Sequence, residues 1–206
     1  MARVSQEHLD ARRRQIIDGA ARCFARDGFH GTSMQGVLKE VGLSAGAVYR
    51  YFSGKEELIE AIADEAFTSI RRAFREAADT TPPPAPDVLL GRVLRGLFSG
   101  EVCGLDGRQF ASLIVQVWSE TMRNESLAAT FDDGYGAMRV VWTDVVEGYR
   151  KAGVMRADVP ADHVARTMMA VAQGFFAQMA LFGDAEPEVL ENGLRGLMAM
   201  QLPSAG

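Results

Sequence analysis

The side chains that could carry covalent or metal chemistry are few and scattered along this 206-residue chain. The histidines are His8, His30 and His163, and the two cysteines, Cys23 and Cys103, lie far apart without a CxxC or Cys/His spacing. No nucleophile motif, paired carboxylates or phosphate-cradling glycine loop accompanies them. We therefore expect no enzyme, no metal site, no cofactor and no disulfide, and we expect both cysteines to be buried as small apolar residues.

Composition and charge leave nucleic acid open as a partner. Hydrophobic residues make up 48% of the chain, which is enough for a sizeable core. The net charge is −5, yet residues 1–60 hold nine Lys or Arg against eight Asp or Glu, so the acidic excess belongs to the rest. No apolar run approaches the ~18 residues of a membrane span, and no signal peptide is visible, which predicts a cytoplasmic protein.

Apolar residues recur at three- and four-residue intervals throughout, which predicts an all-α fold. A first helix is expected over about 10–26, ended by Gly28. Thr32 would cap a second helix, with Gln35 completing a capping box. After a turn at 42–44, Ser44 would cap a short third helix that runs through Tyr51.

A fourth, long helix is expected over 56–78, opened by a capping box of Ser53 and Glu56. Prolines between 82 and 86 must end it. Further helices are predicted over 87–99, 106–123, 125–151, 160–182 and 187–201. This pattern predicts a small three-helix domain, residues 1–55, and a larger helical domain, residues 56–206, which begins with the long connecting helix.

Three short helices with a glycine turn form a helix-turn-helix arrangement. The segments 28–34, 41–52 and 55–58 closely resemble the signature of the tetracycline-repressor (TetR) family, above all the run Leu-Ser-Ala-Gly-Ala-Val-Tyr-Arg-Tyr-Phe. The resemblance covers roughly residues 10–66. The chain departs from it at Ala45, where many members carry a basic residue, and at Val37-Leu38, where an Ile-Ala pair is usual.

The resemblance implies a dimeric repressor that binds a palindromic operator in double-stranded DNA. Arg50 would read guanine, with a phosphate contact as the alternative role. Tyr49, Tyr51 and Lys55 would contact phosphates, although one of the two tyrosines could be a packing residue. The remaining candidates for the DNA-binding surface are Thr32, Ser33, Gln35, Ala45, Gly46 and Ala47.

The larger domain is expected to bind a small-molecule effector and to form the dimer. Aromatic residues on amphipathic helices predict an apolar pocket, even though most such stripes are core. The pocket candidates are Phe98, Phe110, Trp118, Met138, Trp142 and Gln173, with Gln116, Glu120 and Arg139 as further polar anchors. Phe175, Phe176, Leu194 and Leu197 are the candidates for the dimer interface, unless the last two helices simply face their own core.

The sequence thus predicts a repressor that an apolar or aromatic molecule releases from its operator, with the long helix over 56–78 as the only lever between the domains. One alternative is a helical ligand-binding protein whose DNA-facing surface has fallen out of use. The joint presence of Tyr49, Arg50, Tyr51 and Lys55 argues against that alternative.

Overall fold

The computed structural model describes residues 6–98, 103–156 and 158–200, and in these ranges it contains nine α-helices. They are α1 (Gln6–Asp27), α2 (Met34–Val41), α3 (Ala45–Val48), α4 (Lys55–Ala78), α5 (Pro86–Leu97), α6 (Gly107–Thr121), α7 (Glu125–Lys151), α8 (Ala161–Phe182) and α9 (Pro187–Met198). The all-α prediction is confirmed, and the helix boundaries agree within a few residues. The expected helix ends at residues 99 and 201 lie outside the described residues.

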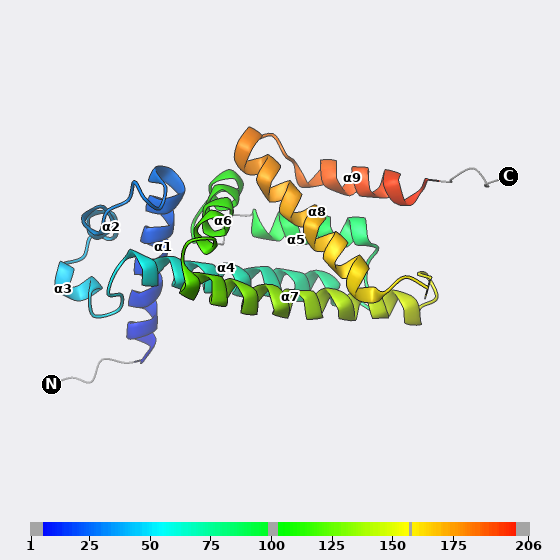
Figure 1. Cartoon of the computed structure of the whole chain (residues 1–206), viewed down its shortest axis with the longest axis horizontal. Helices are drawn as coiled ribbons and strands as arrows, with labels where there is room; N and C mark the ends of the chain where they lie inside the picture. Colours follow the sequence, from blue (N-terminus) through cyan, green and yellow to red (C-terminus); the bar gives the residue numbers. More distant parts are fainter. Residues whose placement is uncertain (1–5, 99–102, 157, 201–206) are drawn as a thin grey trace.

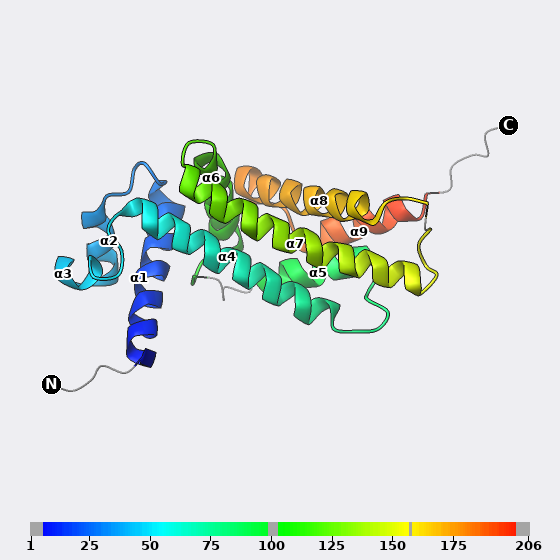
Figure 2. The same cartoon turned by 60° about the horizontal axis from the view of Figure 1, so that its bottom comes forward.

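The molecule is elongated, with α1–α3 at one end (Figure 1). The long helices α4 and α7 run side by side along its length, α8 packs on α6 and α7, and α5 pairs with α9 (Figures 1 and 2). A single buried apolar core runs through the whole structure. In the described residues no helix is long and apolar enough to cross a membrane.

The small domain is held together by the apolar faces of α1 and α2. Ile16, Ala20 and Phe24 of α1 and Val37 of α2 are inaccessible to solvent. Gly28 directly follows the last residue of α1. Its φ of 78° is the left-handed conformation, which glycine adopts without strain and which ends the helix. This part of the sequence prediction is confirmed.

Two predicted capping boxes are wrong. Ser33, not Thr32, caps α2, because its Oγ accepts the Gly36 amide proton at 3.1 Å. Glu57, not Glu56, reaches back to Ser53, where its Oε2 accepts hydrogen bonds from the backbone amide and the hydroxyl. In both cases neighbouring residues have the same functional group, and the backbone path decides which one has the right geometry.

Candidate nucleic-acid interface and interior cavity

The helix α3 is anchored from its inner side. Gly42, with φ of 67°, closes the turn after α2, and the Oγ of Ser44 accepts the Ala47 amide proton at 3.3 Å. Val48 and Phe52 are buried in the core of the small domain. These anchors fix one face of α3 and of the turn that follows, and leave the opposite face to solvent.

That outward face consists of small residues followed by two long side chains. Ala45 and Gly46 are exposed, and a methyl group at Gly46 would meet no atom within 4 Å. Tyr49 is 49% exposed, and Arg50 is exposed beside it in the turn that continues α3. Among the described residues neither side chain has a hydrogen-bond partner. Small residues on this surface allow another molecule to come close to the backbone of α3, and the phenol of Tyr49 and the guanidinium of Arg50 lie at its edge, available for hydrogen bonds.

Some of the other predicted DNA contacts are accessible to solvent, whereas others are already hydrogen-bonded within the protein. Ser33 and Gln35 are exposed at the start of α2, and Ala47 and Tyr51 are half-buried. Thr32 is only 4% exposed, and its hydroxyl donates to the Gly28 carbonyl at 2.8 Å. Its proton is used inside the protein, so we assign the Thr32 hydroxyl a structural role instead of the expected phosphate contact.

The ammonium group of Lys55 is also hydrogen-bonded within the protein. Its Nζ donates to the Phe29 carbonyl oxygen at 3.0 Å and lies 4.8 Å from the centre of the Phe29 ring. The ammonium thus ties the first residue of α4 to the loop between α1 and α2. The sequence showed the charge of Lys55 but not this internal partner, which depends on how α4 leaves the small domain.

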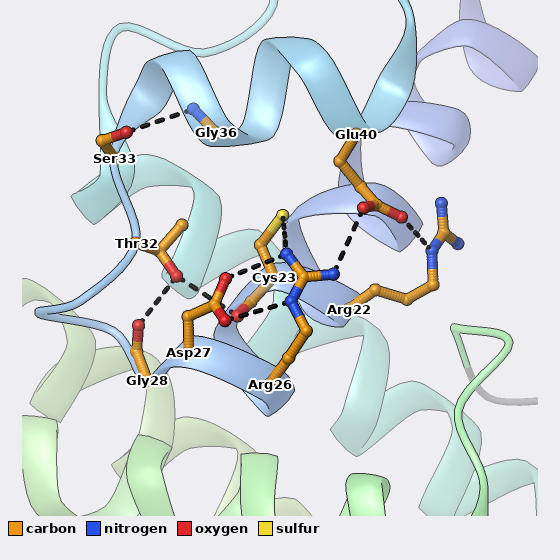
Figure 3. A network of polar contacts seen from close by, with 9 residues as sticks. All are labelled: Arg22, Cys23, Arg26, Asp27, Gly28, Thr32, Ser33, Gly36 and Glu40. Atoms are coloured by element: carbon orange, nitrogen blue, oxygen red, sulfur yellow. Dashed lines mark hydrogen bonds and ion pairs between the residues drawn. The ribbon is translucent and has the colours of Figure 1, made fainter.

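A polar network locks α2 onto α1 beside this loop (Figure 3). The carboxylate of Glu40 on α2 contacts Arg22 at 2.8 Å and Arg26 at 3.4 Å, both on α1. The hydrogen bond from Arg22, with help from Arg26, holds the pKa of Glu40 below its usual value. Two of the nine basic residues in this part of the chain are thus paired with a carboxylate inside the small domain.

The thiol groups fit the expectation that the cysteines are packing residues. Cys23 and Cys103 are free and buried. Burial raises the pKa of Cys23, and burial together with the nearby charge of Asp18 raises that of Cys103 to about 12. Both thiols are therefore protonated near neutral pH, the unreactive form.

An apolar cavity of about 90 Å³ lies among α4, α6, α7 and α8. Four of the six predicted pocket residues, Trp118, Met138, Trp142 and Gln173, line it. The other lining residues are Ala63, Ala66, Phe67, Ile70, Ile114, Val117, Phe131, Tyr135, Met169, Ala172 and Phe176. No charged side chain of the described residues lines this cavity.

Phe98 and Phe110, which the sequence also predicted as pocket residues, do not line this cavity. The centres of both rings lie 5.9 Å from that of Phe176, which does line the cavity. Phe176 itself was expected at the dimer interface. The spacing of aromatic residues in the sequence identified the apolar faces of the helices, but not which of these faces line the cavity.

Three of the four predicted interface residues are buried within the chain. Phe175, Phe176 and Leu194 are each less than 10% exposed, whereas Leu197 is 66% exposed. The apolar side chains that α8 and α9 do expose are Leu181, Phe182, Val189, Leu197 and Met198. A groove between these helices is lined by Phe175, Val189, Leu194 and Leu197, among others.

Two of the expected polar anchors instead face the small domain. The Oε1 of Gln116 accepts the Phe29 amide proton at 3.0 Å, and Glu120 Oε2 lies 3.2 Å from His30 Nε2. Arg139 pairs with Asp162 at 3.6 Å. The expectation that the fourth helix alone joins the two parts is also wrong, because α6 packs on α1.

Comparison with known proteins agrees with this arrangement. Residues 16–62 match the model of the bacterial regulatory proteins of the tetR family, and residues 89–202 match that of the C-terminal domain of BetI-type transcriptional repressors. The chain is 26% identical over 200 residues to the HTH-type transcriptional repressor Rv1474c of Mycobacterium tuberculosis, covering 95% of this chain and 99% of that protein.

Solved structures show the same fold. GusR of Salmonella enterica superposes with a TM-score of 0.73 at 25% identity, over 97% of this chain and all of that one (100%). A regulator from Saccharomonospora viridis, solved in complex with choline, has a TM-score of 0.73 at 22% identity, over 92% of this chain and 96% of that one.

Proposed function

Because the chain belongs to the tetR family of helix-turn-helix transcriptional repressors, we propose that it binds a palindromic operator as a two-fold dimer and leaves it when an uncharged small molecule fills the central cavity. The family consists of transcriptional regulators and not of enzymes. In this proposal residues 1–55 form the DNA-binding unit, and residues 56–206 the effector and dimer unit. Because its partner is operator DNA, we expect the protein to act in the cytoplasm.

The free, exposed pair of Tyr49 and Arg50 beside small residues is the observation that carries the DNA-binding site. A major groove about 12 Å wide admits a helix whose leading residues are small, here Ala45 and Gly46. The guanidinium of Arg50 suits the O6 and N7 atoms of guanine, and the Tyr49 hydroxyl suits a phosphate. Ser33 and Gln35 at the start of α2, with Ala47 and Tyr51, complete the contact set. Lys55 supports it by its charge and by its bond to the loop.

Recovery of DNA from sheared genomic fragments by the purified protein tests this proposal. Sequencing should return palindromic sites whose half-sites are about one helical turn apart. Arg50→Ala should then lose about 1–3 kcal/mol per half-site on the recovered operator and little on random DNA. Equal losses on both would reduce Arg50 to a phosphate contact.

The dimer is proposed on a revised surface. Leu181, Phe182, Val189, Leu197 and Met198 are exposed on α8 and α9, and Val189 and Leu197 also line the groove between these helices. Large exposed apolar patches are uncommon on soluble monomers and mark interaction sites. A second copy, related by a two-fold axis, would cover it and would present two recognition helices to the two half-sites.

The walls of the cavity support an uncharged, aromatic effector. Its polar groups are limited to those of Trp118, Tyr135, Trp142 and Gln173, which can orient a hydroxyl or a carbonyl. Burial of a full charge without a counter-ion is costly. An apolar cavity of about 150 Å³ binds benzene, and because this cavity is smaller, an aromatic effector would also displace part of the lining.

A quaternary ammonium ion is the second candidate. Six aromatic residues line the cavity, and aromatic rings attract such cations. The similar regulator from Saccharomonospora viridis was solved with choline. Choline and its uncharged isostere dimethylbutanol separate the two candidates, because they differ only in charge. Release of operator DNA by choline alone would favour the cation, and release by indole and dimethylbutanol would favour the uncharged class.

A further inference from the structure

The loop between α1 and α2 is held at one residue by side chains from two other helices, α4 and α6. The amide of Phe29 donates to Gln116 Oε1 of α6 at 3.0 Å, and its carbonyl accepts from Lys55 Nζ of α4 at 3.0 Å. The ring of Phe29 is buried and packs edge-on against Phe24, with the ring centres 5.4 Å apart. Phe29 thus has little freedom to move without moving its partners.

This loop fixes where α2 begins. The amide and the hydroxyl of Thr32 both donate to the Gly28 carbonyl, at 3.1 and 2.8 Å, so residues 28–32 form one compact turn. Ser33 then caps α2, and α2 leads through Gly42 into α3. A shift of Phe29 is therefore passed on to the start of α2, and through it to the exposed face of α3.

Gln116 belongs to a helix that also forms a wall of the cavity. Ile114, Val117 and Trp118 line the cavity, whereas Gln116 and Glu120 face the small domain from the other side of α6. An occupant of the cavity contacts α6, because α6 is one of the four helices that form its walls, and a bulky occupant presses on this helix. Motion of α6 changes the distance between Gln116 Oε1 and the Phe29 amide.

We propose that Gln116 is the positioning residue that transmits occupancy of the cavity to the DNA-binding surface, by releasing the Phe29 amide when α6 is displaced. This inference rests on the proposed function, since it gives the route by which an effector would act. It differs from a lever formed by α4 alone, because the contact that breaks belongs to α6. The contact between Glu120 and His30 joins the same two parts of the chain but lies nearer to solvent, where the side chain of His30 is 70% exposed.

The test replaces the unidentified effector by a side chain. Ala172 lines the cavity from α8, whereas Phe29 is held by α4 and α6, so Ala172→Phe fills the space from a third helix. Amide hydrogen exchange of residues 28–36 is measured in the full-length protein. In the otherwise wild-type chain, Ala172→Phe should speed this exchange roughly threefold to tenfold, the effect expected from loss of about one hydrogen bond.

The same change is then made in three further backgrounds. In Gln116→Leu the exchange of residues 28–36 should already be fast, and Ala172→Phe should add little, because contacts that act in series are not additive. Gln116→Glu retains an acceptor oxygen and should restore the response. Gln15→Leu is the matched control: Gln15 Nε2 donates to the Val41 carbonyl at 3.0 Å inside the small domain, so its loss should leave the response unchanged.

Two results would overturn the inference: an equal response to Ala172→Phe in the Gln116→Leu background, or no response in the otherwise wild-type chain. Circular dichroism checks folding, and Ala172→Leu replaces the larger side chain if Ala172→Phe unfolds the protein. Hydrogen exchange needs neither operator nor effector. A failure to bind DNA would thus count against the proposed function, while the exchange data would still decide the role of Gln116.

Discussion

Gly19 of α1 and Val41 of α2 meet where the two helices cross, and a methyl group at Gly19 would lie 2.3 Å from Cγ1 of Val41. This is shorter than any contact that carbon atoms tolerate, and the branched side chain of Val41 has few ways to withdraw. The absence of a side chain at Gly19 thus sets the distance between the two helices that carry α3.

Gly19→Ala should therefore destabilise the small domain. We expect a strain of about 1–3 kcal/mol, offset in part by the ~1 kcal/mol that alanine gains over glycine in a helix. Thermal unfolding should shift down by a few degrees, and operator affinity should fall because the tilt of α2 changes. An unchanged melting temperature would show that the two helices can separate without cost.

Gly46→Ala should have the opposite effect on stability. Gly46 is exposed in α3 with open space around it, so alanine adds helix propensity without a clash. The added methyl group points away from the protein, into the space that DNA would occupy. We expect an equal or higher melting temperature together with operator binding at least about tenfold weaker, a loss of ~1.4 kcal/mol. Undiminished operator affinity would place the DNA contact elsewhere.

Two Tyr→Phe changes separate DNA contact from stability. The Tyr49 hydroxyl is exposed and without a partner in the described residues, so Tyr49→Phe should weaken binding to all DNA sequences by about 1 kcal/mol per half-site and leave unfolding unchanged. The buried Tyr149 donates to the Pro84 carbonyl. Tyr149→Phe should instead lower stability by about 1 kcal/mol and leave DNA binding unchanged. Calorimetry and fluorescence anisotropy measure the two effects.

The double variant Val189→Glu, Leu197→Glu should be monomeric in light scattering. Both side chains are 66% exposed on α9, so glutamate is tolerated in the monomer but repels its symmetry mate across an apolar interface. Val140→Glu on α7, 59% exposed, is the control and should remain dimeric. A dimer in both variants would move the interface away from α9. Leu194 is unsuitable for this test because it is buried in the chain's own core.

Glu40→Gln should lower stability in a manner that depends on pH. Arg22 and Arg26 hold the pKa of Glu40 in the folded state below 4.5, its ordinary value. The stabilisation is therefore fully present above that value and is lost as the pH falls through the lower pKa of the folded state. Denaturant unfolding should separate wild type from Glu40→Gln at pH 7 and bring the two together in acid. Glu76→Gln, at an exposed site on α4, should show no such difference.

The sequence predicted the helices well and the faces of the helices less well. The signals that start and end helices are local, such as the prolines after α4, so α4 and α7 were predicted within a residue of their observed bounds, although Glu57 and not the expected Glu56 bonds to Ser53 before α4. Gln116 and Trp118 are two residues apart on one helix and therefore point to opposite sides of it. Only the packing of α1 against α6 shows which side faces the cavity and which faces the small domain. Likewise, Phe175 and Phe176 are neighbours in sequence, yet one lines the groove of α8 and α9 and the other the cavity.

The position of the small domain at one end of an elongated molecule gives the chain an electric polarity. Residues 1–60 carry a slight positive excess, and the acidic surplus is carried by the larger domain, which in Figure 1 extends away from α3. Near DNA, which is a polyanion, this charge distribution produces a torque on the protein. The torque turns the acidic larger domain away from the DNA before any contact forms. Collisions with DNA are thus biased toward the productive orientation, and this bias weakens as added salt shortens the ~10 Å screening length.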